Sequence, residues 1–554
     1  MATDQPTFAY RRSPDQAATT PVLHPVIVVG AGPVGLTAAI DLAMRGRPVL
    51  LLDDDDRLST GSRAICFAKR TLEIWDRLGC GGRMVQKGVS WSRGRVLFRD
   101  EEVYAFDLSP ESRHSFPAFI NLQQYHVESF LLERARELPH LEIRWRNEVV
   151  GIRQTKEAVE LEIATPDGPY SLTCDYLIAA DGARSAVRRF MGLESKGRTF
   201  RDRFLIADIK MSADLPTERR FWFDPPFHPG QSVLLHRQPD DLWRVDFQLG
   251  WDADPELERQ PERVIPRVRA LLGAQTEFTL EWVSVYTFAC VRMERFRHGR
   301  VLFAGDAAHS VSPFGARGAN SGVQDADNLV WKLDAALTGA APETLLDSYG
   351  SEREQAADEN IRHSSRSTDF ITPKSGISRT FRDATLELAR SCGFARRLVN
   401  TGRLSTATTY TDSPLGTPDR EPFEGGLPPG AAAIDAPVAH HGAADWLLRH
   451  LDGEFVALLL VRALPIDAPA LAALRVWARA PVPIRPVALV QEPGGPEPAE
   501  LLVLHDVEGL FALRYAAAPG TVHLFRPDQH LAARWRQLDA GLVAAAAARA
   551  LGHG

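Results

Sequence analysis

The sequence predicts an α/β fold that begins with a nucleotide-binding βαβ unit, and three observations support this fold class. Apolar runs at 26–29 and 49–52 flank a helical pattern at 33–44, as two buried parallel strands flank a crossover helix. Short strands and proline-rich loops alternate through residues 199–290, which is typical of an inserted antiparallel β-sheet. A largely helical segment and a smaller α/β region complete the chain.

We therefore expect one nucleotide-binding domain in two parts, an insertion between them, and a separate C-terminal domain. Helical patterns at 64–78 and 125–136 belong to the first part. A stretch rich in proline and glycine is the expected linker to the last domain. The expected segments are a disordered lead-in (1–24), the first part of the nucleotide-binding domain (25–198), the substrate-binding sheet (199–290), the second part with its helices (291–410), the linker (411–438) and the C-terminal domain (439–554).

Composition excludes several function classes. Of the 554 residues, 44% are hydrophobic and 24% are charged, as in ordinary globular proteins. The formal net charge of −7 argues against binding to nucleic acid or to an anionic membrane surface. The five cysteines show no paired spacing, so we expect no disulfide framework and no metal site. Because no signal peptide and no membrane-spanning apolar run is evident, we expect a cytoplasmic protein.

The segment Gly30-Ala31-Gly32-Pro33-Val34-Gly35 fits the dinucleotide fingerprint G-x-G-x-x-G. Gly30 permits the tight turn, Gly32 lets a pyrophosphate approach the backbone, and Gly35 lets helix and strand pack closely. Asp53 follows 18 residues after Gly35 and would accept hydrogen bonds from the adenosine ribose. The alternative is a glycine turn without a ligand, which the flanking strand, helix and acid disfavour.

The acids that follow Asp53 affect the choice of nucleotide. Asp54, Asp55 and Asp56 extend a run of four carboxylates, and their charge would repel a phosphate on the ribose. FAD or NAD therefore fits this site better than NADP. No second G-x-G-x-x-G occurs, so if FAD is resident, a nicotinamide cofactor must bind without a domain of its own.

Residues 301–333, VLFAGDAAHSVSPFGARGANSGVQDADNLVWKL, place an acid, a proline and four glycines between an apolar strand and a helix. Asp306 at the end of the strand is either a ligand-binding carboxylate or a cap for the following turn. The glycines permit close approach of the backbone to a ligand.

Three motifs together resemble the group A flavin-dependent aromatic hydroxylases, and the likeness covers nearly the whole chain. The motifs are GAGPVG at 30–35, LIAADGARSAVRR at 177–189 and the segment 302–333. The phenol hydroxylase and 3-(3-hydroxyphenyl)propionate hydroxylase branch is the most similar. The resemblance implies a Rossmann-like FAD-binding domain and a C-terminal thioredoxin-like domain that supports a homodimer. No cysteine follows Cys392, which excludes thiol–disulfide chemistry in that last domain.

The resemblance also implies an activity. Such a monooxygenase reduces FAD with NADH or NADPH, and O2 then forms a C4a-hydroperoxyflavin that hydroxylates a small phenolic compound. An aromatic polyketide-type hydroxylase shares this architecture and remains an alternative, as does a flavin-bound sensor or binding protein without turnover. A flavin halogenase is disfavoured, because no W-x-W-x-I-P segment occurs.

By resemblance, several residues are expected to contact the flavin. Asp306 would bind the ribityl hydroxyls, and Pro313 would line the reaction site beside the ring. Backbone N–H groups of Gly318, Ala319 and Asn320 would face the flavin edge on which negative charge develops during reduction.

Three further positions resemble cofactor contacts of the family. Arg63 would lie beside the mobile flavin. Gln124 would contact FAD, although the adjacent Gln123 leaves the register open, and either Arg63 or Gln124 could instead be a surface residue. Asp181 belongs to the Asp-Gly motif, with Arg184 and Arg188 as candidate ion-pair partners.

Substrate contacts are expected on the inserted sheet. Tyr286 resembles an active-site tyrosine that would hold a phenol or phenolate, and His236 is a candidate base or hydrogen-bond partner. Arg317 replaces the glutamine of the family's Gly-Gln-Gly and would either favour an anionic substrate or reduced flavin, or point to solvent. No general base is assigned, because the acid of phenol hydroxylase near the second helix is absent. The candidate wall residues are Phe221, Trp222, Phe223, His228, His236, Arg244 and Tyr286.

Overall fold

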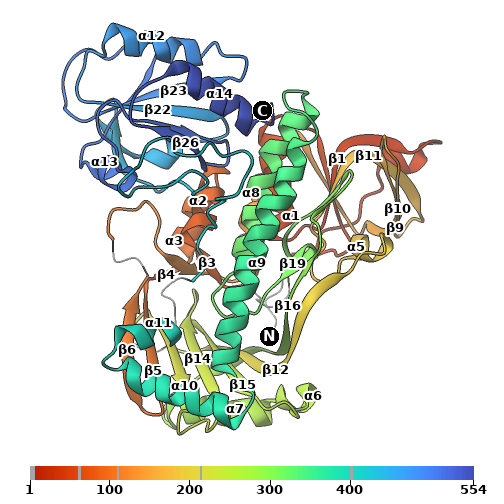
Figure 1. Cartoon of the computed structure of the whole chain (residues 1–554). Helices are drawn as coiled ribbons and strands as arrows, with labels where there is room; N and C mark the ends of the chain where they lie inside the picture. The colour runs from red at the N-terminus through yellow and green to blue at the C-terminus, as the bar shows by residue number, and fades with distance from the viewer. Residues whose placement is uncertain (1–5, 60–63, 109–110, 213–214, 400–403, 554) are drawn as a thin grey trace. The chain divides into compact units, whose positions relative to one another are not determined.

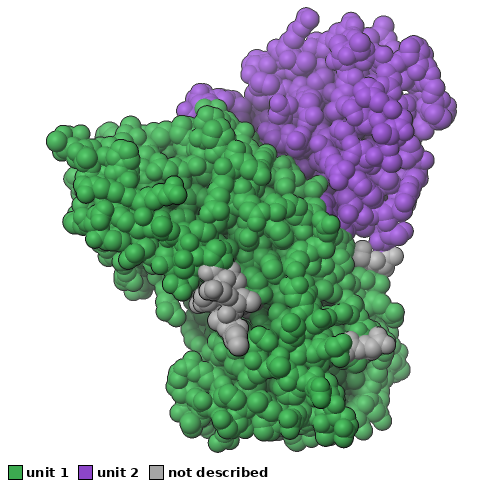
Figure 2. All heavy atoms as spheres, turned by 180° about the vertical axis from the view of Figure 1, so that it is seen from behind, with its two compact units in different colours: residues 1–110, 117–326, 357–406 green, residues 111–116, 327–356, 407–554 purple. Residues whose placement is uncertain are grey.

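The computed structural model describes residues 6–59, 64–108, 111–212, 215–399 and 404–553. These form two compact units, which are coloured separately in Figure 2. Unit 1 comprises residues 1–110, 117–326 and 357–406, and unit 2 comprises residues 111–116, 327–356 and 407–554.

Unit 1 contains the predicted nucleotide-binding sheet, whose parallel strands follow the order β18-β11-β1-β2-β8 (Figure 1). Residues 26–29 of β1 and 49–52 of β2 are buried, which explains why these two segments are continuous hydrophobic runs. The predicted crossover helix is confirmed as α1 (Pro33–Met44), closed by Gly46 at φ +75°. The strands are β1 (Val22–Val29), β2 (Val49–Asp53), β8 (Leu141–Trp145), β11 (Tyr170–Ala179) and β18 (Val301–Phe303), with antiparallel additions β9 (Glu148–Gln154), β10 (Val159–Ala164) and β17 (Arg297–His298).

Two local predictions differ from the structure. The described part of the lead-in forms a short 3₁₀ turn, η1 (Pro14–Ala17), and Asp15 there accepts a hydrogen bond from Arg144 at 2.7 Å. The helix predicted at 64–78 begins only at Lys69, because the residues before it form a strand in a three-stranded sheet. This sheet contains β3 (Cys66–Ala68), β7 (Phe119–Asn121) and β4 (Val89–Trp91), and the neighbouring helices are α2 (Lys69–Arg77), α3 (Gly81–Lys87), α4 (Gln124–Arg136) and α5 (Ala186–Phe190).

The second large sheet of unit 1 has eight strands in the order β19-β16-β12-β15-β14-β13-β5-β6. Its outer face packs on helix α7 (Pro261–Leu272) through residues such as Trp243 and Val245. Its inner face carries the alternate residues, including Phe204 and Phe223. The strands are β5 (Arg93–Phe98), β6 (Glu101–Asp107), β12 (Ser195–Lys210), β13 (Arg219–Phe223), β14 (Ser232–Arg237), β15 (Leu242–Leu249), β16 (Thr279–Met293) and β19 (His309–Ser310), with helix α6 (Pro255–Glu258) nearby.

Two long helices lie side by side in Figure 1, and the first of them begins within the third motif. They are α8 (Gly318–Leu337) and α9 (Leu345–Ile371), preceded by a 3₁₀ turn η2 (Gly305–Ala307) and followed by α10 (Gly376–Ala389) and α11 (Gly393–Val399). The helical character predicted after residue 333 is confirmed.

Unit 2 contains a seven-stranded sheet in the order β21-β20-β24-β23-β22-β25-β26. Its interior strand β22 is the apolar run FVALLLV, of which six residues are buried. Among the described residues, no helix is both long and apolar enough to cross a membrane. The elements are β20 (Pro437–His440), β21 (Ala443–Trp446), β22 (Phe455–Val461), β23 (Ile484–Val490), β24 (Leu502–His505), β25 (Val522–Phe525), β26 (Leu531–Trp535), α12 (Ala468–Trp477), α13 (Leu510–Tyr515), α14 (Ala540–Ala550) and the turn η3 (Leu447–His450).

Candidate functional site

The predicted phosphate-binding turn lies between β1 and α1, and its backbone is tightly constrained. Gly30 has φ +103°, and a Cβ there would lie 2.5 Å from the carbonyl oxygen of Ala180, the residue that follows β11. A Cβ on Gly35 would lie 1.9 Å from the carbonyl oxygen of Gly30. A Cβ on Gly32, in contrast, would meet nothing within 4 Å. The turn therefore leaves open space beside a helix N-terminus, which fits a pyrophosphate.

Asp53 lies at the carboxyl end of β2 and is held beside that turn. Its Oδ2 accepts a hydrogen bond from Ala31 N at 2.5 Å, and its Oδ1 accepts one from Asp55 N at 2.9 Å. Burial raises the pKa of Asp53 to about 6, and the nearby charges of Asp54 and Asp55 add to this shift. Hydroxyl donors would favour the charged carboxylate, so the site fits a ribose.

The second motif provides a carboxylate with an unsatisfied oxygen. Asp181 Oδ2 accepts a hydrogen bond from Val187 N at 3.0 Å. Its Oδ1 is buried and has no hydrogen-bond partner among the described residues, and burial raises the pKa of Asp181. The predicted ion pair with Arg188 is not formed, because that guanidinium donates to the carbonyl oxygens of Ala307 and Ala183, each at 2.6 Å.

The turn that carries Asp306 is anchored from α8. Gly305 N donates to Asp325 Oδ2 at 2.9 Å, and His309 Nε2 lies 2.8 Å from the same oxygen. A Cβ on Gly322 of α8 would lie 2.7 Å from Val34 Cγ2 of the first motif and 3.0 Å from Gly305 Cα. The exposed carboxylate of Asp306 therefore projects from a turn that is packed against the first motif.

The predicted flavin-edge loop runs from Pro313 to the start of α8. The N–H groups of Gly318, Ala319 and Asn320 occupy the first turn of this helix, where no intrahelical acceptor is available. The Asn320 side chain has a structural role, because it accepts from Ala68 N and Thr71 Oγ1 at 2.8 and 2.7 Å. It also donates to the carbonyl oxygens of Cys66 and Ala316 at 2.9 and 2.6 Å.

The structure separates the two adjacent glutamines. Gln124 accepts a hydrogen bond from Ala64 N at 3.2 Å and donates to Ser59 Oγ at 3.0 Å. Gln123 instead donates to Pro239 O at 3.3 Å. The two side chains thus have different partners, and the predicted flavin residue Arg63 lies outside the described residues.

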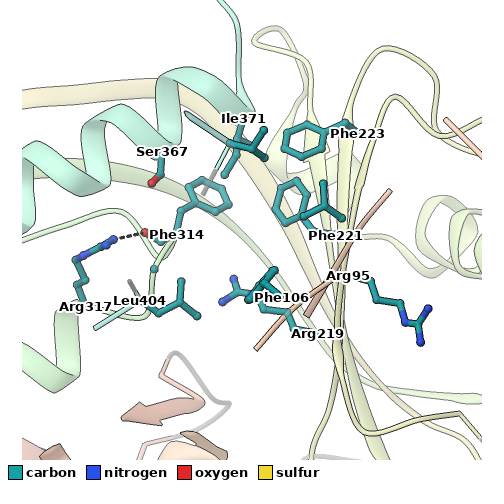
Figure 3. A pocket seen from close by; sticks show the side chains of 13 residues that line it. Arg95, Phe106, Arg219, Phe221, Phe223, Phe314, Arg317, Ser367, Ile371 and Leu404 are labelled. Atoms are coloured by element: carbon teal, nitrogen blue, oxygen red, sulfur yellow. Dashed lines mark hydrogen bonds between the residues drawn. The ribbon is translucent and has the colours of Figure 1, made fainter. Parts of the chain in front are cut away.

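A pocket opens between the flavin-edge loop and the inner face of the second sheet (Figure 3). Phe314 of the loop packs against this face, with its ring centroid 4.9 Å from Phe204 and 5.6 Å from Phe288. Aromatic and aliphatic side chains form much of the wall, and three arginines also line the pocket. These residues are Phe106, Phe221, Phe223, Phe314, Ile371 and Leu404, with Arg95, Arg219 and Arg317.

The predicted substrate residues have different positions relative to the pocket. Phe223 and Arg317 line it, and Tyr286 is half-buried in the cluster behind its aromatic wall. Trp222 belongs to the outer-face core and cannot serve as a wall residue. Arg244 is buried and donates to both carboxylate oxygens of Asp208 at 2.8 Å, so it is already paired.

The structure also shows the surroundings of two further candidate substrate residues, His228 and Arg317. His228 Nε2 lies 2.7 Å from Gln248 O, and its ring packs edge-on to Phe247 of the outer-face core. Arg317 does not point to solvent: it is 5% exposed and donates from Nη1 to Phe314 O at 3.2 Å. Burial lowers the pKa of Arg317 to about 10.

Sequence reasoning missed three polar residues near His236. Arg219 lines the pocket, Asp246 lies 3.9 Å from His236 Nε2, and Cys66 Sγ lies 4.0 Å from His236 Nδ1. His236 is 3% exposed, and burial together with Arg219 and Arg244 lowers its pKa well below the ordinary value. The alternation of polar residues along these strands is visible in the sequence. Which of them become neighbours depends on how the strands pair, and the local sequence does not show this.

Comparison with known proteins shows the family to which the chain belongs. The FAD binding domain family matches residues 24–364. The 6-methylpretetramide 4-monooxygenase of Streptomyces rimosus is 31% identical over 525 residues, which cover 92% of this chain and 90% of that protein. The 3-(3-hydroxy-phenyl)propionate/3-hydroxycinnamic acid hydroxylase of Mycolicibacterium gilvum (strain PYR-GCK) is 28% identical over 538 residues, covering 94% and 91%.

The solved structures support the fold. The crystal structure of the flavin-dependent monooxygenase PieE, in complex with FAD and substrate, superposes with a TM-score of 0.82. The alignment covers 97% of this chain and all of that one at 23% identity. With the family match over more than half of the residues, these likenesses show that the chain belongs to the FAD binding domain family and is a group A flavin-dependent aromatic hydroxylase.

Proposed function

We propose that this enzyme hydroxylates a phenolic compound in the pocket on the inner face of the second sheet, using FAD, O2 and NADH or NADPH. The observation that carries the proposal is the double role of Phe314. It belongs to the predicted flavin-edge loop, and its ring is part of the pocket wall. An aromatic ring in this pocket would therefore lie beside the loop that is expected to face the flavin.

The chain's own residues would hold FAD along the edge of the first sheet. Gly30, Gly32 and Gly35 leave room for the pyrophosphate, and Asp53 would bind the ribose. Asp181 and Asp306 would accept hydrogen bonds from the rest of the cofactor. When bound, FAD would carry electrons from the nicotinamide and deliver one oxygen atom from O2 to the substrate.

Three kinds of group would surround the reactive edge of the flavin. The N–H groups at the start of α8, at 318–320, would stabilise negative charge on the reduced ring. Pro313 would line the reaction site, and Arg63 and Gln124 would contact the mobile ring. The aromatic wall would exclude water from the reacting atoms, which limits wasteful side reactions.

The remaining features of the proposal concern substrate and assembly. Tyr286 and His236 lie on or beside the pocket face and are candidates to bind the ring hydroxyl. Small phenols are the first substrate class, and aromatic polyketides are the second; one relative that matches 92% of the chain is named 6-methylpretetramide 4-monooxygenase. We further expect a cytoplasmic homodimer whose thioredoxin-like domain supports dimerisation.

The test measures oxidation of NADH and of NADPH by the FAD-loaded protein, with and without a panel of aromatic compounds. The panel contains phenol, resorcinol, 4-nitrophenol, 3-(3-hydroxyphenyl)propionate and a polycyclic phenol. We expect at least one member to stimulate oxidation and to give a product that gains one atom of oxygen-18 from labelled O2. If no member stimulates oxidation or gains oxygen, the phenol proposal is wrong and a non-catalytic flavin-bound protein is favoured.

A further inference from the structure

Three polar side chains project from neighbouring strands on the inner face of the second sheet. Arg219 lies on β13, His236 on β14 and Asp246 on β15. Strand pairing aligns Leu234 of β14 with both Phe221 of β13 and Asp246 of β15. Because alternate residues of a strand share a face, Arg219, His236 and Asp246 all point to the pocket side of the sheet.

Arg219 is a cation without a counter-ion. Among the described residues, its guanidinium makes no hydrogen bond or ion pair, and its close contact is the ring of Trp91, 6.0 Å from Arg219 Cζ. Arg219 lines the aromatic pocket, and burial lowers its pKa. A charge that is partly withdrawn from water and has no partner is costly, so this guanidinium is suited to a ligand that accepts hydrogen bonds.

Asp246 is the matching unsatisfied acceptor. Its Oδ1 is buried and has no hydrogen-bond partner in the described part of the chain, and His236 Nε2 is 3.9 Å from its Oδ2. Its side chain is nevertheless 17% exposed, so part of it borders open space. Burial raises the pKa of Asp246 to about 6, although Arg244 and Arg219 oppose this shift.

The neighbouring charges do not neutralise this pair. Arg244 donates to both oxygens of Asp208 at 2.8 Å, so those two charges satisfy each other. Arg219 and Asp246 influence each other electrostatically but form no ion pair among the described residues. One donor and one acceptor therefore remain available at the same end of the sheet face.

The pair also lies near the flavin-edge loop. His236 Nδ1 is 4.0 Å from Cys66 Sγ, and the carbonyl oxygen of Cys66 accepts a hydrogen bond from Asn320 at 2.9 Å. Asn320 belongs to the first turn of α8, whose N–H groups are expected to face the flavin. A short chain of contacts thus connects Asp246 with the predicted reaction site.

We propose that Arg219 and Asp246 bind the ring hydroxyl of the substrate and that Asp246 is the base that removes its proton. This inference rests on the proposed function, because Arg219 lines the proposed substrate pocket and Asp246 lies on the same face of the sheet. The hydroxyl would donate to Asp246 and accept from Arg219. The O–H proton moves to the carboxylate of Asp246, and the oxygen keeps the electron pair as a phenolate beside Arg219. A phenolate ring is more electron-rich and accepts electrophilic oxygen more readily.

The first experiment uses the unaltered FAD-loaded protein. Binding of 4-nitrophenol is compared with binding of 4-nitroanisole, its methyl ether, through the change in flavin absorbance. We expect the ether to bind at least about tenfold more weakly, because it cannot donate to Asp246. If neither probe binds, the comparison is made with the fastest phenol of the panel and its methyl ether. Equal binding of phenol and ether would overturn the inference and leave the proposed function intact.

The second experiment uses variants. Asp246→Asn should lower kcat by roughly a hundredfold or more at pH 7, because a general base contributes about 10²–10⁴-fold. The defect should shrink as pH rises and the substrate ionises in solution, which a merely structural defect would not do. Arg219→Gln should weaken phenol binding about tenfold, with partial rescue in Arg219→Lys. Arg220→Gln, on the same strand but paired with Glu218, is the matched control and should be unaffected.

The pH profile must be interpreted with all groups that face Asp246. These are Arg219 on β13, His236 on β14, Arg244 on β15, Asp208 on β12 and Cys66 on β3. Normal turnover by Asp246→Asn, or a defect that does not shrink as pH rises, would overturn this inference and leave the proposed function intact. Failure of every phenol to stimulate the unaltered protein would instead remove the proposed function and this inference together.

Discussion

The guanidinium of Arg317 folds over Gly315 so closely that a Cβ on residue 315 would lie 1.9 Å from Arg317 Nη1. Gly315 has φ +108°, a conformation that other residues adopt only with strain. The glycine therefore gives the pocket its buried arginine, because it makes space for the side chain two positions later.

Gly315→Ala should displace Arg317 and strain the loop. We expect the free energy of unfolding to fall by about 1–3 kcal/mol and the KM for the phenolic substrate to rise. Gly339→Ala is the control, because Gly339 also has positive φ, at +72°, but a Cβ there meets nothing within 4 Å. The control should lose stability without a change in KM. An unchanged KM in Gly315→Ala would show that Arg317 does not contribute to binding.

Asp53 should make FAD binding depend on pH. Its folded pKa of about 6 lies above its ordinary value of 3.8, so the carboxylate is protonated in the apo protein below pH 6. Ribose hydroxyls would favour the charged form, so FAD affinity should fall as pH decreases from 7 to 5, by up to about tenfold per pH unit. Asp53→Asn should bind FAD more weakly and with little dependence on pH, as measured by equilibrium dialysis. A steep dependence that persists in this variant would assign it to another group.

The Asp325 carboxylate should be required for the turn that carries Asp306. Gly305 N and His309 Nε2 share one oxygen of Asp325, so Asp325→Ala would leave both without this acceptor, at a cost of about 1–3 kcal/mol in a buried site. We expect weaker FAD retention together with lower stability. His309→Asn keeps the acceptor for Gly305 N and should retain FAD better. Equal loss of FAD from both variants would contradict a specific role for the Gly305 contact.

The cofactor motifs were predictable from sequence because their geometry is local. The glycines of 30–35 act through their own turn, and helix α1 has the bounds that its pattern predicts. The start of α2 was not predictable, because the helix propensity of the residues before Lys69 is overridden by pairing of β3 with β7.

The substrate site was less predictable because it depends on contacts between distant residues. Arg244 was expected to bind substrate, but Asp208, 36 positions earlier, already occupies its guanidinium. Arg219 and Asp246 lie on β13 and β15, and β14 lies between them. Nothing in the local sequence of either residue indicates the other, so the structure was needed to find the pair.

Unit 2 is predicted to depend on a buried ion-pair network around Glu352 of α9. Arg526 donates to both of its carboxylate oxygens, at 2.6 and 3.0 Å, and Lys332 Nζ lies 2.7 Å from Oε2. The three side chains are at most 2% exposed. Glu352→Gln would leave the buried Lys332 without its ion-pair partner and Arg526 with Asp528 alone, which should cost about 3–5 kcal/mol. Chemical denaturation followed by the tryptophans of unit 2 would measure this loss.

The same network determines how the stability of unit 2 should change with pH. Although burial alone would raise it, Arg526 and Lys332 hold the pKa of Glu352 well below its ordinary value of 4.5. Its contribution to stability is therefore complete above pH 4.5 and is lost as pH falls toward the folded pKa. Glu352→Gln should flatten this acid-side loss, whereas Asp358→Asn, which removes a half-exposed pair with Arg292, should cost under about 1 kcal/mol. Equal costs for the two variants would contradict a special role for burial, because only Glu352 is shielded from water.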